Sequence, residues 1–260
     1  MERIAQVFNK LQRRGQTAFI PFSIAGYPSR EASLEIFLGL AAEGGDILEF
    51  GFPFSDPVAD GPVIQNASAQ AIRNGMTMDK ALDIVGHIRQ KSEIPIIFFG
   101  YFNPIHKYGT ERFVARAVEC GLDGVLVVDL PWEEARWLKP ITDKAHLAWI
   151  YLATPTTPTS RIAQMDQEGS GFLYYVSLTG VTGARDFLPT GLASKCEQVK
   201  GVCRLPLAVG FGVSHPDHAA ALKEHVDAVV VGSAILSRLQ NGNSINDLKG
   251  WLGKMKSALL

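Results

Sequence analysis

The sequence has few cysteines, no long apolar run and no excess of either charge. Cys120, Cys196 and Cys203 are odd in number and lack the spacing of a metal or redox site, which predicts reduced thiols and a cytoplasmic location. No apolar stretch approaches the roughly 18 residues that a membrane-spanning helix needs. Lysine and arginine (25) nearly balance aspartate and glutamate (26). The net charge of -1 argues against a nucleic acid or an anionic membrane as the main partner.

Several kinds of catalytic machinery are also missing. No lysine lies in a short apolar, strand-like run, and the nearest loop lysine is Lys107, which disfavours a Schiff-base aldolase. His106 and His215 are isolated, and no histidine and carboxylate residues show metal-ligand spacing, so we expect no metal site. There is no G-x-S-x-G elbow and no Walker loop. The N-terminus lacks a signal-peptide core, and its apolar residues recur at helical spacing, which predicts a helix that packs on the domain.

The sequence does contain a repeated alternation of short apolar runs and amphipathic segments. Runs rich in Val, Ile, Phe and Tyr predict eight strands buried on both faces, at 18–24, 46–50, 95–101, 124–128, 147–152, 172–177, 206–209 and 228–231. Amphipathic patterns predict helices at 30–42, 78–90, 111–120, 133–145, 160–167, 188–199 and 215–223. The predicted helix-start residues are Ser29, Thr77, Thr110 and Pro216.

This pattern determines the expected fold class. Repeated βα units form a parallel sheet, and eight units in 260 residues fit a closed (β/α)8 TIM barrel with an extra N-terminal helix. An open doubly wound sheet is the alternative. No linker or low-complexity segment divides the chain, so we expect residues 1–260 to form one domain.

Two carboxylates stand where such a barrel would hold its chemistry, at the carboxyl end of the second strand and in the loop after it. Glu49 lies in an apolar run, where a carboxyl group is partly protonated unless it is paired, as a general acid must be. Strand alternation places Glu49 on the face opposite Phe50. Asp60 could return to the same pocket. The alternatives are a core ion pair for Glu49, a turn role for Asp60, and a turn or interface role for Asp56.

Glycine-bearing segments follow the last three predicted strands. They are T-G-V-T-G (179–183), G-F-G-V-S (210–214) and G-S-A-I (232–235). In these barrels the loops after strands seven and eight commonly bind phosphate, because backbone amides and a helix N-terminus favour an anion. The aromatic residues at the strand ends are Phe22, Tyr101, Tyr174 and Phe211. Together these features suggest a substrate with an apolar ring and a phosphorylated tail.

The chain resembles the tryptophan synthase alpha chain family over essentially its whole length. The resemblance rests on F-I-P-F-S-I-A-G (19–26), the loop P-F-S-D-P-V-A-D-G-P (53–62), Y-F-N-P (101–104), D-L-P (129–131), Y-Y-V-S-L-T-G-V-T-G (174–183), G-F-G (210–212) and G-S-A-I (232–235). It implies a (β/α)8 barrel that cleaves indole-3-glycerol phosphate into indole and glyceraldehyde 3-phosphate by a retro-aldol reaction.

The resemblance also implies roles for individual residues. Glu49 corresponds to the acid–base that protonates indole C3, and Asp60 to the carboxylate that holds the indole N–H. Thr182 resembles the loop threonine that bonds the aspartate when the site closes, and Tyr174 the tyrosine near the catalytic carboxylate. Phe22, Tyr101 and Phe211 resemble the lining of the indole pocket. The positions that match phosphate-binding residues are Gly183, Gly212, Gly232 and Ser233.

The resemblance implies a partner as well. Alpha chains of this family work with a β chain in an α2β2 heterotetramer, and the pyridoxal phosphate cofactor belongs to the β chain, so none is expected here. Asp56 and the loop around Pro57 resemble the surface that contacts the β chain. Two other readings remain open: a regulatory subunit that cleaves little, and a related barrel such as indole-3-glycerol phosphate synthase or a phosphosugar epimerase. The former barrel would need a lysine at a strand end, and the latter usually has a metal site.

Overall fold

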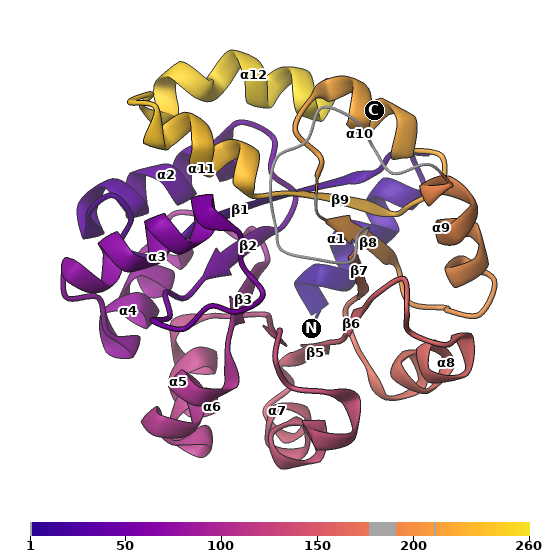
Figure 1. The fold of residues 1–260 in the computed structure, drawn as a ribbon, viewed down its shortest axis with the longest axis horizontal. Coiled ribbons are helices and arrows are strands. Elements are labelled where there is room, and N and C mark those ends of the chain that lie inside the picture. Colours follow the sequence, from indigo (N-terminus) through magenta and orange to yellow (C-terminus); the bar gives the residue numbers. More distant parts are fainter. Residues whose placement is uncertain (1, 177–190, 211) are drawn as a thin grey trace.

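The structure, a computed structural model, describes residues 2–176, 191–210 and 212–260. Its strands form one parallel sheet, in the order β5-β4-β3-β2-β1-β9-β8-β7-β6. The strands are β1 (Ala18–Ile24), β2 (Leu48–Gly51), β3 (Ile96–Gly100), β4 (Gly124–Val127), β5 (Ala148–Ile150), β6 (Leu152–Ala153), β7 (Leu173–Val176), β8 (Leu207–Gly210) and β9 (Ala228–Val231). The sheet curls into a ring that the helices surround (Figure 1).

The ends of this sheet meet at a single residue. β5 pairs with β4 and β6 pairs with β7, and only Tyr151 separates β5 from β6. The chain itself therefore closes the barrel at this point. The predicted (β/α)8 barrel is confirmed, and the open-sheet alternative is wrong. The predicted single strand at 147–152 is corrected to two short strands, β5 and β6. The first part of the segment pairs with β4 and the second part pairs with β7.

The helices alternate with the strands, as the sequence pattern predicts. They are α1 (Glu2–Gln12), α2 (Arg30–Ala42), α3 (Pro62–Arg73), α4 (Met78–Arg89), α5 (Phe102–Tyr108), α6 (Thr110–Cys120), the 3-10 helix η1 (Trp132–Trp137), α7 (Lys139–Lys144), α8 (Thr159–Glu168), α9 (Leu192–Lys200), α10 (Pro216–Leu222), α11 (Ser233–Gln240) and α12 (Ile245–Ser257). Ser29 and Thr77 cap α2 and α4 through their side chains, and Pro216 opens α10, as predicted.

Three helix predictions need correction. The predicted helix at 133–145 is divided into η1 and α7, because Pro140 has no N–H and its ring prevents a continuous helix through that point. Thr110 is the first helical residue of α6, and Gly109 is the N-cap. The helix predicted at 188–199 begins in the described residues at Leu192 and runs to Lys200; residues 188–190 lie outside them.

Side chains alternate between the barrel interior and the helix layer. The register aligns Phe22 with Glu49, Glu49 with Ile97 and Ile97 with Gly124, so these residues share one face. Phe50 packs on Phe37 of α2, with ring centroids 4.7 Å apart. Because Phe50 points outward, Glu49 points into the barrel. The predicted alternation is confirmed.

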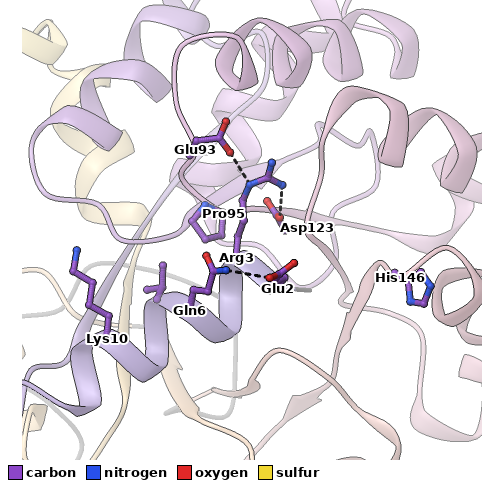
Figure 2. Close-up of a pocket in the computed structure, with 9 residues that line it drawn as sticks. Glu2, Arg3, Gln6, Lys10, Glu93, Pro95, Asp123 and His146 are labelled. Atoms are coloured by element: carbon purple, nitrogen blue, oxygen red, sulfur yellow. Dashed lines mark hydrogen bonds and ion pairs between the residues drawn. The ribbon is translucent and has the colours of Figure 1, made fainter.

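The N-terminal helix α1 packs across the amino ends of the strands. Its Ile4, Phe8 and Leu11 are buried, and the rings of Phe8 and Phe172 lie 5.9 Å apart. Figure 2 shows Arg3 of this helix reaching two carboxylates, Glu93 at 2.9 Å and Asp123 at 3.2 Å. A cavity of about 850 Å³ lies between α1 and the strand ends. The predicted N-terminal helix is thus confirmed as a cover for one end of the barrel.

One polar device recurs at the amino ends of the strands. A residue before one strand donates its N–H to a carbonyl of a neighbouring strand, at 2.8–2.9 Å, and its side-chain oxygen accepts the N–H of the same partner residue, at 2.7–2.9 Å. We call each such pair a strand-start clasp. The four clasps are Asp46 with Phe19, Asp123 with Ile96, Ser170 with Trp149, and Asp227 with Leu207. They satisfy backbone donors where the ladder begins.

We expect Asp123→Ala to lower the free energy of unfolding by about 3 kcal/mol or more, because it leaves the Ile96 N–H without its acceptor and the Arg89 cation with neutral carbonyl partners alone. Asp123 is 3% exposed and accepts from Ile96 N–H and from the largely buried Arg89, at 2.9 and 2.8 Å. Urea unfolding measures the loss. Arg3→Ala is the matched control, since it removes only a half-exposed cation and should cost less than about 1 kcal/mol. Equal losses from the two changes would contradict the importance of the clasp.

Candidate active site

Glu49 is a buried carboxyl group near the carboxyl end of β2. It is 2% exposed, and its Oε1 has no hydrogen-bond partner among the described residues. Burial, assisted by the charge of Asp60, raises the pKa of Glu49 to about 8. No ion pair to Glu49 occurs in the described part of the chain, so the core ion-pair reading is not supported there. At neutral pH this group holds a proton.

Asp60 reaches the same interior from the loop that precedes α3. It is 3% exposed, and its Oδ2 accepts a 2.9 Å hydrogen bond from the Tyr101 hydroxyl. That hydroxyl accepts the Ala59 N–H at 3.1 Å, so Tyr101 fixes both the loop and the carboxylate. Burial raises the pKa of Asp60 to about 6, and the bond from Tyr101 opposes this rise. Asp60 also serves the turn, because its N–H donates to Pro57 and its carbonyl accepts from Gln65.

Aromatic side chains fill the space around the two carboxyl groups. Phe22 of β1 and Tyr174 of β7 are both 3% exposed, and Phe99 of β3 lies between them, 5.3 Å from the Phe22 ring and 6.5 Å from the Tyr174 ring. Burial raises the pKa of Tyr174 well above its usual value, and the charges of Glu49 and Asp60 add to this effect. The structure therefore brings together five residues that were predicted from the sequence. They are Phe22 of β1, Glu49 of β2, Tyr174 of β7, Asp60 of the loop before α3, and Tyr101 after β3.

Two glycines at strand ends make room for these rings. A methyl group at Gly210 would lie 1.9 Å from Tyr174 Oη, and one at Gly232 would lie 2.9 Å from Phe22 Cδ1. Neither distance is compatible with a side chain. Gly210 and Gly232 belong to segments predicted to approach an anion, and the structure gives both glycines a packing role as well.

The predicted phosphate positions lie at the start of α11 and in the loop after β8. Gly232 is the N-cap of α11, and Ser233 is its first residue. The amides that begin a helix have no preceding helical carbonyl to accept them, so they face outward as anion donors. Gly212 has a φ of 87°, which favours glycine. Gly183, Thr182 and Phe211 lie outside the described residues.

Sequence reasoning missed two aromatic neighbours of the site. Phe99 lies in β3, and Phe54 packs on Tyr101 with ring centroids 5.0 Å apart. Phe99 stands in the run I-I-F-F-G, where the alternation that identified Glu49 also places it on the inner face. Phe54 had no such signal, because its position depends on the path of the loop.

The arrangement supplies an acid and an anion in one pocket. Their environments separate the two pKa values, and such a pair can divide proton transfer from charge stabilisation. Among residues 2–176, 191–210 and 212–260, no group of three His, Cys, Asp or Glu side chains could hold a metal ion. None of the described helices has the length and apolarity to cross a membrane.

Comparison with known proteins identifies the family. A model of the tryptophan synthase alpha chain family matches residues 8–257. The chain belongs to the tryptophan synthase alpha chain family. The alpha chain of Geobacter sp. (strain M21) is 44% identical, over all of this chain and 98% of the relative. Members of this family are enzymes of tryptophan biosynthesis, and the resemblance noted in the sequence is confirmed.

Solved structures agree with the tryptophan synthase alpha assignment. The crystal structure of tryptophan synthase subunit alpha from Legionella pneumophila matches with a TM-score of 0.92 and 36% identity, over 99% of this chain and 98% of that one. A structure of Mycobacterium tuberculosis tryptophan synthase also matches with a TM-score of 0.92, at 30% identity and the same coverage. Both support the barrel fold found here.

We expect Glu49→Gln to stabilise the protein at high pH. Unfolding returns the pKa of Glu49 from about 8 to its ordinary value of 4.5, so between these pH values the unfolded chain has lost a proton that the folded chain keeps. The free energy of unfolding of the parent therefore falls as pH rises through this window. Glutamine does not titrate, so the variant does not show this fall. The free energy of unfolding of the variant minus that of the parent should therefore grow by on the order of 3 kcal/mol from pH 5 to pH 8.

Urea unfolding at the two pH values measures this advantage. Asp56→Asn on the exposed part of the loop is the matched control and should show no such growth. An advantage of Glu49→Gln that is the same at both pH values would refute the buried, protonated carboxyl group.

Proposed function

We propose that this chain is a lyase that cleaves indole-3-glycerol phosphate to indole and glyceraldehyde 3-phosphate by a retro-aldol reaction. The observation that carries the proposal is the pair of unequal carboxyl groups: Glu49, whose pKa is about 8, and Asp60, whose pKa is about 6. Near pH 7 the first is mostly protonated and the second mostly ionised. Family membership supports the same reaction.

Glu49 is proposed to move protons. Its carboxyl group donates a proton to indole C3, which disrupts the aromatic system and leaves positive charge on the ring nitrogen. The resulting carboxylate then takes the proton of the side-chain hydroxyl, as the bond between C3 and the side chain breaks and an aldehyde forms. Glu49 ends the cycle protonated, so no external acid is consumed. A group with a pKa near the working pH is suited to both steps.

Asp60 is proposed to hold the indole N–H and to stabilise the positive charge that develops there. An ionised, buried carboxylate beside a developing cation stabilises the transition state more than the uncharged ground state. The bond from Tyr101 supports this role, because it opposes protonation and fixes the carboxylate without an ion pair that would compensate its charge.

The substrate is proposed to lie across the mouth of the barrel. Its indole ring would pack among Phe22, Tyr101, Tyr174 and the undescribed Phe211, with Thr182 bonding Asp60 when the site closes. Its phosphate would meet the start of α11 at Gly232 and Ser233, together with Gly212 and the undescribed Gly183. Phe22 lies against Gly232, so the proposed ring and phosphate regions are contiguous.

The partner is proposed to be a tryptophan synthase β chain, in an α2β2 heterotetramer. The family name and the M. tuberculosis tryptophan synthase structure support a second chain. The pyridoxal phosphate would belong to that β chain, and cleavage would use only side chains of this one. The loop around Pro57 is the proposed contact, since Asp56 and Val58 are both exposed on it and Val58 is 69% exposed.

We expect Glu49→Gln to reduce the cleavage rate at least about 1000-fold, because a buried amide can neither donate nor accept the transferred proton. Indole release from indole-3-glycerol phosphate, assayed with and without the β chain, measures the effect, and circular dichroism checks the fold. In the parent, kcat/KM should fall below pH 6, where Asp60 is protonated, and above pH 8, where Glu49 has lost its proton.

Asp56→Asn is the control variant, and its kcat/KM should fall below pH 6 and above pH 8 as in the parent. Near-normal turnover by Glu49→Gln would remove the acid–base assignment. If the parent itself releases no indole even with the β chain, the chain is a regulatory subunit instead.

We expect Asp60→Asn to lower kcat about 100- to 1000-fold while phosphate binding is kept, because asparagine can accept the indole N–H but carries no charge to stabilise the cation. Inhibition by inorganic phosphate, compared between variant and parent, tests whether binding is kept. Unchanged catalysis would return Asp60 to its turn role alone.

A further inference from the structure

The D-L-P segment (129–131) follows β4 at the carboxyl end of the barrel, and the proposed chemistry does not use it. Just before this segment, the Val128 N–H still donates to the Gly100 carbonyl of β3, at 3.0 Å. Asp129 therefore stands immediately past this bond, at the level where Tyr101 leaves β3.

Asp129 binds the backbone directly after Tyr101. Its Oδ1 accepts the Phe102 N–H at 2.7 Å. Phe102 is the first residue of α5 and Tyr101 is the N-cap, but the Tyr101 side chain makes no cap bond and the first turn of α5 has no acidic residue. A helix start needs an acceptor for its free amides and favours negative charge. Asp129 supplies both from the loop after β4.

Tyr101 carries this attachment into the active site. Its ring packs on Phe54 with centroids 5.0 Å apart, and its hydroxyl donates to Asp60 Oδ2 at 2.9 Å and accepts the Ala59 N–H at 3.1 Å. Burial and the charge of Asp60 raise the pKa of Tyr101 above its usual value, and the charge of Asp129 adds to this rise. Tyr101 is thus held at its backbone by Asp129 and holds Asp60 through its hydroxyl.

We propose that Asp129 is a positioning residue of the candidate active site, which fixes the backbone at Tyr101 and thereby the hydrogen bond from its hydroxyl to Asp60. Hydrogen bonds weaken steeply when donor and acceptor move apart or lose alignment. Loss of the Asp129 carboxyl group should therefore weaken the bond to Asp60 and let that carboxylate take up a proton more readily. Because it gives Asp129 a part in cleavage, this inference rests on the proposed function.

The titratable groups that face Asp60 come from three strands or their ends. Among the described residues they are Glu49 of β2, Tyr101 after β3 and Tyr174 of β7. The charge of Asp60 raises the pKa of Glu49 and of Tyr174, whereas the Tyr101 hydroxyl donates a hydrogen bond that favours the ionised form of Asp60. An effect of Asp129 that passes through Tyr101 should therefore appear in the titration of Asp60.

The ¹³C carboxyl signal of Asp60, identified by its loss in Asp60→Asn, reports this titration in the whole chain without any turnover. Asp129→Ala should raise the midpoint by about half a pH unit, because a complete hydrogen bond changes the proton affinity of its acceptor about fivefold. Asp129→Asn keeps an oxygen for the Phe102 N–H and should titrate as the parent does. Glu111→Ala removes an exposed carboxylate at the start of α6, and as the matched control it should also leave the midpoint unchanged.

A double-variant cycle with Tyr101→Phe tests whether the effect passes through the hydroxyl. Tyr101→Phe alone should raise the midpoint at least as far as Asp129→Ala, and addition of Asp129→Ala should then raise it no further. Additive shifts would mean that Asp129 acts by another route, and they would overturn the proposal. No shift in Asp129→Ala, or equal shifts in Asp129→Ala and Asp129→Asn, would overturn it as well.

Turnover separates this inference from the proposed reaction. Below pH 6, kcat/KM for indole release should be about threefold lower in Asp129→Ala than in the parent, as a half-unit rise in the midpoint requires. Asp129→Asn should follow the parent. If the Asp60 signal behaves as expected but the parent releases no indole even with the β chain, the cleavage proposal fails and the positioning by Asp129 stands. Normal cleavage with an unmoved Asp60 midpoint in Asp129→Ala would overturn the positioning alone.

Discussion

The burial of the Glu49 carboxyl group is the constraint on which the barrel interior depends. A carboxyl group keeps its proton near neutral pH only if its neighbours offer neither water nor a cation. Phe22 and Tyr174 exclude water, and they fit because Gly232 and Gly210 give them space. The strand register then fixes where the carboxyl group points. The protonation of Glu49 is thus set first by packing, and the charge of Asp60 acts in the same direction.

Asp60 is buried as well, but unlike Glu49 its carboxylate accepts a hydrogen bond that favours the ionised form. It is almost as deeply buried, yet the Tyr101 hydroxyl bonds its oxygen, and its pKa rises only to about 6. This hydroxyl bond is one cause of the contrast between the two carboxyl groups, and the charge of Asp60, which raises the pKa of Glu49, is another. The same hydroxyl accepts the Ala59 amide, so the loop and the ionisation state of Asp60 depend on one side chain.

Most of the barrel could be predicted from the sequence, because strands buried on both faces are continuous apolar runs and the helices between them are amphipathic. Glu49 was visible as a charge inside such a run. The break at Tyr151 was not, since pairing with a different neighbour leaves no mark on apolar composition. Helix α12 was missed although Ser244 and Asp247 form a capping box at its start. Tyr101's bond to Asp60 depends on a loop path that local pattern does not encode.

The strand-start clasps occur at every second junction between neighbouring strands of the barrel wall. They join β1 to β2, β3 to β4, β5 to β7 and β8 to β9, one clasp for each successive pair of wall positions, since β5 and β6 share one position. The side-chain closure of the wall therefore repeats every two strand positions, while the backbone ladder runs through all of them. Loss of one clasp side chain would therefore free a backbone donor at one strand pair and leave the other three pairs closed.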